Sequence, residues 1–224
     1  MLKALQALPR KREERGQTLG DFRFAHLLGA KVWARLPLSV RKRFGKRLGP
    51  GASVVYRGEV IETRLSLLGR IFAQILRPIG APLPLEQSKG GEAAIVTVTE
   101  APNGQGQFWT RQYNRKAGFP QVIHSQKSFT GPTGLEEQVG GGIGMTLRLK
   151  AEPKSLLFVS DEYFINLFGT RIYFPRWLTP GALTVGHHDL GNGRFDFTLD
   201  LVHPLFGHLL HQRARFIDMK DTIK

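Results

Sequence analysis

The stretch from Leu183 to Ile217, LTVGHHDLGNGRFDFTLDLVHPLFGHLLHQRARFI, carries the clearest structural signal in the chain. From Arg194 to Leu201 polar and apolar residues alternate, which is the period of a strand with one buried and one solvent-facing side. Asn192-Gly193, just before this run, is a dipeptide that tolerates the positive φ angles of a tight hairpin turn. We therefore predict that residues 183–190 pair antiparallel with residues 194–203, and that the rest of the chain supplies neighbours for this hairpin.

Short alternating runs separated by glycine, proline and asparagine indicate further strands on both sides of the hairpin. Since strands follow one another without intervening helices, the sheet should be antiparallel, and a long meander tends to curl until its edges are covered. The predicted fold class is α+β: a strongly curved antiparallel β-sheet or partly closed β-barrel, with N-terminal helices and one helix inserted after the first strand. The expected strands are 54–64, 94–99, 107–113, 121–129, 135–139, 145–150, 155–165 and, after a bend at 204–211, 213–218.

Helical spacing of apolar residues occurs in three places. Phe24, Leu27, Leu28 and Val32 predict one helix, residues 39–48 a second after Pro37, and residues 65–76 a third. The wide apolar stripe of the third helix predicts that it faces the core. The expected organisation is a flexible basic N-terminus at 1–20, a single β-rich domain at 21–218 and a tail at 219–224.

Composition excludes several function classes. The chain has no cysteine, which removes disulfides, thiolate catalysis and cysteine zinc sites. No apolar run approaches the roughly 18 residues of a membrane span. Residues 1–50 carry 13 Lys and Arg against 3 Asp and Glu, whereas residues 51–224 carry 19 against 15.

This charge asymmetry predicts contact between the basic helices at residues 23–47 and an anionic membrane surface; the simpler alternative is a solvated helical face. The expected location is cytoplasmic, peripheral to the inner membrane face. Nucleic acid is a disfavoured partner, because the basic residues are not interleaved with the aromatic ones on a single open face.

The candidate ligand site lies on residues 107–113, whose alternation puts Trp109, Arg111 and Tyr113 on one face. A curled sheet often leaves a cavity with apolar walls and a few polar groups. We expect Trp109 and Trp177 to form the wall and Arg111 to hold an anionic group. Glu136 is expected to point inward and pair with Arg111, since a buried carboxylate is costly unless it is paired.

Three histidines, His203, His208 and His211, are close in sequence near the end of the chain. On a helical bend His208 and His211 would sit three residues apart, but a metal site needs a further ligand that the neighbouring sequence does not supply. The adjacent pair His187 and His188 should point to opposite faces of a strand. The sequence predicts no metal site and assigns no role to these histidines.

Two other patterns carry no cofactor or nucleophile. The glycine run at 140–144 lacks the Lys-Ser/Thr ending of a phosphate-binding loop and leads into an extended segment. Ser125 and Ser160 lack the glycines of a nucleophile elbow. No cofactor is predicted, and no catalytic residue is assigned.

A series of short motifs follows in a characteristic order along residues 21–218. The motifs are Phe24–Leu36 leading into Pro37 and Val40-Arg41, Tyr56-Arg57-Gly58, Leu65–Leu76 followed by Pro82 and Pro84, Trp109–Tyr113, His124-Ser125, Leu135-Glu136, Pro175–Leu178 and Pro204–Gly207. In order and spacing they resemble a bacterial family, domain of unknown function 4166 (DUF4166). The resemblance implies no established chemistry. Some members resemble C-terminal additions to dehydrogenase-like domains, which implies at most a partner relationship. The chain departs from the family pattern in the looser turn at Gly140–Gly142 and at His208 and His211, where apolar or aromatic residues are expected.

Three functions stay open at this level. The first is a non-catalytic binding module that holds an amphipathic or lipid-like small molecule in the curved sheet, at a membrane surface. The second is an enzyme that uses Glu136 or a histidine as acid and base. The third is a structural partner module for a dehydrogenase-like protein. A roomy apolar cavity with Arg111 on its wall would favour the first, and a solidly packed interior would favour the third.

Overall fold

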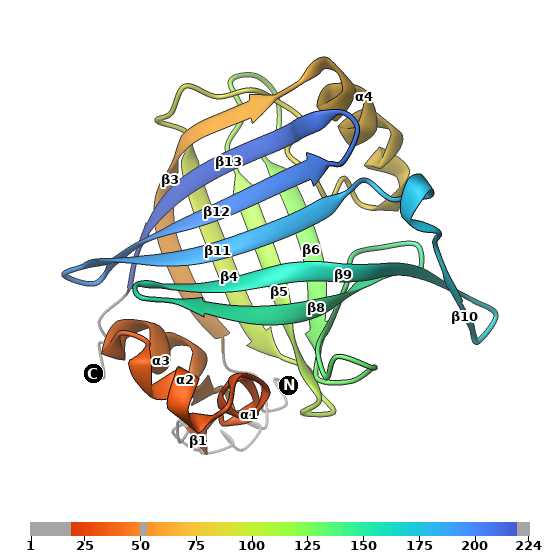
Figure 1. Ribbon diagram of the computed structural model, residues 1–224. Helices are drawn as coiled ribbons and strands as arrows, with labels where there is room; N and C mark the ends of the chain where they lie inside the picture. Colours follow the sequence, from red (N-terminus) through yellow and green to blue (C-terminus); the bar gives the residue numbers. More distant parts are fainter. Residues whose placement is uncertain (1–18, 50–52, 219–224) are drawn as a thin grey trace, which may run out of the picture.

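The computed structural model describes residues 19–49 and 53–218 (Figure 1). The segments 1–18 and 219–224, which hold most of the predicted flexible N-terminus and the predicted tail, lie outside the described residues. Within them the chain forms a closed antiparallel barrel with short helices at both ends.

Ten strands form the ring, and every pairing between them is antiparallel. In ring order they are β9 (Ser155–Leu167), β11 (Ala182–Gly191), β12 (Arg194–His203), β13 (Gly207–Ile217), β3 (Ser53–Leu65), β4 (Ala93–Glu100), β5 (Gly106–Tyr113), β6 (Gln121–Ser128), β7 (Glu136–Gln138) and β8 (Ile143–Glu152). Pairing of β8 with β9 closes the ring. The strand β10 (Thr170–Tyr173) pairs with β9, and β1 (Leu19–Gly20) pairs with β2 (Lys46–Arg47).

The predicted hairpin is confirmed as β11 and β12. Asn192 and Gly193 both adopt positive φ, 54° and 71°, as a tight hairpin turn requires. The predicted inward side of β12 is buried, from Phe195 to Leu201. The predicted bend at 204–211 is wrong in extent, because β13 begins at Gly207, whose φ of 67° turns the chain back within a few residues.

In the first long strand, β3, the backbone of the neighbouring strand comes very close to Gly58. A Cβ atom on Gly58 would lie 1.9 Å from the carbonyl oxygen of Arg215 on the neighbouring strand β13. Only glycine therefore allows the two strands to approach this closely.

The N-terminal helices are α1 (Arg23–Leu28), α2 (Ala30–Arg35) and α3 (Leu38–Phe44), and they lie at one end of the barrel (Figure 1). Gly29, with φ of 79°, divides what the apolar spacing predicts as one helix into α1 and α2. Their buried residues Phe24, Val40 and Phe44 reach the interior aromatic cluster.

The helix α4 (Leu67–Ile75) and the short 3-10 helix η1 (Arg77–Ile79) lie at the opposite end (Figure 1). The prediction that the apolar stripe of α4 faces the core is partly wrong. Its buried residues are Gly69 and Ala73, while Leu67 and Ile75 are 73% and 64% exposed. The helix packs through its small face, because a Cβ atom on Gly69 would lie 1.9 Å from the carbonyl oxygen of Leu209.

None of the helices in residues 19–49 and 53–218 is long and apolar enough to cross a bilayer.

Candidate functional site

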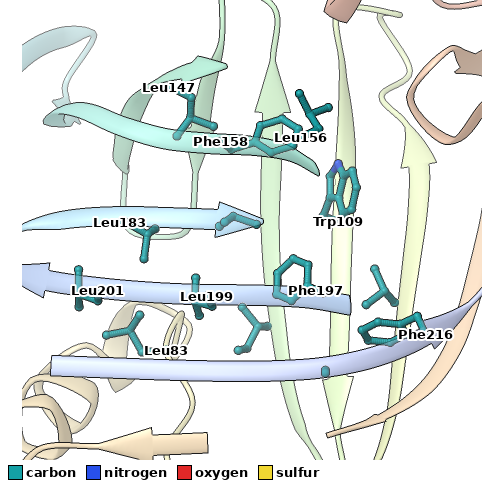
Figure 2. Packing of buried hydrophobic residues seen from close by; sticks show 14 of the residues in the cluster. Leu83, Trp109, Leu147, Leu156, Phe158, Leu183, Phe197, Leu199, Leu201 and Phe216 are labelled. Carbon is teal, nitrogen blue, oxygen red and sulfur yellow. The ribbon is translucent and has the colours of Figure 1, made fainter. Parts of the chain in front are cut away.

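A cavity of about 220 Å³ lies inside the barrel at the α4 end. A single buried water needs only roughly 10–15 Å³, so the cavity has room for a ligand with many heavy atoms. Strands of the ring form its walls, and α4, η1 and the segment around η2 (Arg176–Leu178) cover it. Figure 2 shows Leu183, Leu199 and Leu201 pointing into the barrel from β11 and β12. The apolar lining also includes Phe72, Leu76, Leu83, Ile123, Met145, Phe174 and Phe197.

The other end of the interior is filled. Phe24 and Phe44 from the N-terminal helices contact Phe158, with ring centroids 5.9 and 5.6 Å away. Trp109 and His187 complete this aromatic cluster, both within 6.5 Å of the Phe44 ring. The cavity is thus confined to the half of the barrel that these side chains do not reach.

Three charged side chains form a buried cluster between the cavity and the aromatic end. Arg111 on β5 donates from Nη2 to Oε1 of Glu137 at 3.0 Å, and Lys127 on β6 donates from Nζ to Oε2 at 2.6 Å. Arg111 is 8% exposed, Lys127 1% and Glu137 3%. Lys127 also lies over the Trp109 and Phe158 rings, 5.1 and 5.3 Å from their centroids. Arg111 and Glu137 line the cavity.

Burial and charge shift the titration of this cluster. Burial lowers the pKa of Lys127, Glu137 partly restores it, Arg111 lowers it further, and the pKa lies at about 8. Burial raises the pKa of Glu137, but Lys127 and Arg111 together outweigh burial and bring it to about 2. At neutral pH the cluster therefore holds two cations and one carboxylate.

One positive charge in this cluster has no counter-charge among the described residues that contact it. A buried charge is stable only when it is paired and hydrogen-bonded. Nε of Arg111 is buried and has no hydrogen-bond partner within the described ranges. The floor of the cavity is consequently cationic.

The predicted pairing of Glu136 with Arg111 is wrong, because the adjacent carboxylate, Glu137, occupies that place. Strand neighbours point to opposite faces, and Glu137 is the one that faces inward with Lys127 opposite it. Glu136 is also buried, but it binds Arg171 of β10 through Nη1 and, at 3.0 Å, through Nη2. Arg171 covers this carboxylate from outside the ring, so the Glu136 pair is a structural clamp.

The structure separates the remaining predicted site residues. Tyr113 lines the cavity, and burial raises its pKa to about 12, so it stays a neutral phenol. Trp109 shares the inward face of β5, as predicted, but belongs to the filled aromatic end. Trp177 is 79% exposed on η2 and does not line the cavity, whereas its neighbour Leu178 does.

Sequence reasoning missed Lys127 and Glu137. Lys127 and Ile123 are four residues apart on β6, so they point to the same side of the strand, and both are buried. The alternation along β6 could therefore have predicted that Lys127 points inward. The strand β7 has only three residues, Glu136–Gln138, which is too short for its phase to be read from alternation.

The histidines do not converge. His187 is buried within the aromatic cluster, and burial together with Arg43 lowers its pKa well below the ordinary value. His188 lies on the other face of β11 and contacts Ser155, which confirms the prediction for this pair. His211 lies on β13, and its Nδ1 atom is 2.6 Å from Oδ1 of Asp200 on β12. The segment around His211 is therefore extended rather than helical. No group of three metal-ligating side chains occurs in residues 19–49 and 53–218.

Comparison with known proteins adds one finding to this geometry. No curated protein matches the chain. A family model described as domain of unknown function (DUF4166) matches residues 36–216, which is most of the chain and nearly the whole barrel. The chain therefore belongs to the DUF4166 family, as the order of its motifs predicts.

Proposed function

We propose that the protein is a non-catalytic binding module for an anionic amphipathic molecule with an aliphatic tail, such as a fatty acid. The observation that carries the proposal is the surplus cation at the floor of a mostly apolar cavity. A carboxylate at Arg111 would balance the charge of the cluster. The tail would lie against Leu183, Leu199 and Leu201 toward α4.

The cavity favours this function over the alternatives. A purely structural partner module has no need for a hollow interior beside a buried charge cluster. An enzyme that used Glu136 would need that carboxylate in the cavity, yet it is held outside the ring by Arg171. The expected location is the inner face of the cytoplasmic membrane, where amphipathic ligands are found and where the net charge of +14 of the whole chain favours association.

Calorimetric titration of delipidated protein with laurate and with 1-dodecanol tests the proposal. The two probes share a tail and differ in the head group. We expect laurate to bind at least about tenfold more tightly, because only laurate neutralises the cluster. In Arg111→Met the preference should disappear. This variant is a fair test of binding, because it leaves Lys127 and Glu137 as a matched pair.

Two results would refute the proposal: neither probe binds, or Arg111→Met binds laurate as well as the unaltered protein does. Native mass spectrometry of protein purified from its own source gives an independent check. A bound fatty acid or similar anion is the expected observation, and a cationic or strongly hydrophilic ligand would contradict it.

A further inference from the structure

Large apolar side chains are exposed together around the α4 end of the barrel. Single exposed apolar residues are ordinary, but a contiguous group marks a surface that contacts another apolar phase or a partner. We call this group the apolar rim. Its members are Leu67, Leu68, Ile71 and Ile75 of α4, Trp177 and Leu178 of η2, and Leu205 and Phe206 of the β12–β13 turn.

The apolar rim surrounds the covered mouth of the cavity. Phe72 of α4 and Leu76, which caps the end of this helix, line the cavity. Leu178 both lines the cavity and is 56% exposed. Gly69 packs against Leu209 of β13, which puts α4 beside the β12–β13 turn. Figure 1 shows α4, this turn and the short helix that follows β10 at the same end of the barrel.

Charge in the segments that form the rim has one sign. Residues 65–85, 167–183 and 203–212 contain no Asp or Glu. They contain four arginines, but Arg171 is paired with Glu136. The other three are Arg70 on α4, Arg77 just after it and Arg176 beside Trp177. Exposed leucine, isoleucine and tryptophan interspersed with arginine, without acidic residues, is the composition of surfaces that insert into the interface of anionic bilayers.

We infer that the apolar rim docks on an anionic lipid bilayer, so that the mouth of the cavity faces the membrane. Tryptophan and the aliphatic side chains would enter the boundary between head groups and acyl chains, and the arginines would contact lipid phosphates. Docking stands on the rim alone. The added step, passage of an acyl ligand between the bilayer and the cavity, rests on the proposed function.

This orientation differs from the one expected from charge alone. The basic helices at residues 23–47 lie at the opposite end of the barrel, so the two faces cannot contact one flat bilayer together (Figure 1). Lys31 and Arg35 are exposed on α2 and belong to that other face. Substituting them supplies a matched control for the rim.

Co-sedimentation of the full chain with vesicles of phosphatidylcholine and phosphatidylglycerol tests the inference. We expect the triple variant Leu67→Gln, Ile75→Gln and Trp177→Gln to lower the partition coefficient at least about tenfold. These side chains are 73%, 64% and 79% exposed, so their substitution should leave folding and laurate binding unchanged. Lys31→Glu with Arg35→Glu should change vesicle binding much less than the rim variant does.

Fluorescence identifies the docked face directly. The chain has three tryptophans: Trp109 is 4% exposed, Trp33 is partly buried on α2 at the opposite end of the barrel, and Trp177 is 79% exposed. If the rim docks, Trp177 should account for most of a vesicle-induced blue shift and protection from iodide, and Trp177→Phe should remove most of the change. A shift that persists in Trp177→Phe would point to Trp33 and the opposite face. The inference is overturned if the rim variant binds vesicles normally, if the Lys31 and Arg35 variant is the one that loses binding, or if the rim proves to join two copies of the chain instead. Loss of vesicle binding with laurate binding intact supports docking, whereas loss of laurate binding with docking intact would refute only the proposed function.

Discussion

The two ends of the barrel interior are built on the same ten strands but are packed in different ways. At the end covered by α1–α3, Phe24 and Phe44 fill the space against Phe158. At the end covered by α4, the helix packs through Gly69 and Ala73 and leaves a cavity of about 220 Å³. The difference teaches that the strands set the diameter of the barrel, while the covering helices decide whether its interior is filled.

The largest expected effect is at the charge cluster on the boundary between the two ends. Glu137→Gln should destabilise the protein by roughly 3–5 kcal/mol, because it leaves Arg111 and Lys127 buried without a carboxylate. Arg111→Met leaves one matched pair and should cost much less. Urea unfolding at pH 7 measures both. Equal losses for the two variants would contradict the charge balance on which the site depends.

Acid should reduce the effect of Glu137→Gln. The pKa of Glu137 falls from an ordinary 4.5 to about 2 in the folded protein. Between pH 4.5 and pH 2 the Glu137 carboxyl binds more protons in the unfolded chain than in the folded protein. The stability that the ion pair contributes is therefore present above pH 4.5 and is lost as pH falls toward 2. The difference in melting temperature between the unaltered protein and the variant should therefore shrink across this range.

Truncation of one leucine at each end compares the packing directly. Leu156→Ala at the filled end should cost about 3–5 kcal/mol, since Leu156 is fully buried and the variant opens a new void. Leu199→Ala on the cavity wall should cost about 2 kcal/mol, because that side chain already faces empty space. Thermal or urea unfolding measures the two losses. An equal cost would mean that the α4 end is as well packed as the other.

Enlarging the same two side chains should also cost more stability at the filled end than at the hollow end. Leu156→Phe forces extra volume into a filled region and should cost about 1–3 kcal/mol. Leu199→Phe enters the cavity and should be neutral or stabilising by up to about 1 kcal/mol. The second variant should also block laurate binding while the protein stays folded. A folded Leu199→Phe that binds laurate normally would place the ligand elsewhere.

The hairpin and the barrel follow from patterns that the sequence displays openly. Phe195, Phe197 and Leu199 alternate with polar residues over a full strand, and Asn192-Gly193 marks the turn, so the local signals agree with the fold. Closure through β8 and β9 was predicted only as a tendency to curl, because no local signal records which distant strands meet.

The site was harder to predict, because a shift of one residue exchanges the faces of a strand. Glu136 and Glu137 are adjacent, and only the register of the short β7 decides which one reaches Arg111. Trp177 was expected on the cavity wall from its aromatic character, yet it lies on a 3-10 helix outside the ring. Periodicity shows which side chains point inward, but not how completely they fill the interior.

The smallest predicted effect is the response of ligand binding to pH, and it concerns the hollow end alone. The pKa of Lys127 at about 8 means that the cluster loses its surplus positive charge as pH rises through this value. Affinity for laurate should therefore fall about three- to tenfold between pH 7 and 9. The bound carboxylate raises the pKa of Lys127, so the midpoint in the complex lies at or above 8. Dodecanol, which is uncharged, should bind equally at both pH values, and Lys127→Met should bind laurate weakly at both. A flat laurate profile in the unaltered protein would show that the ligand head group does not sense this cluster, and the filled and hollow ends would then differ in volume but not in chemistry.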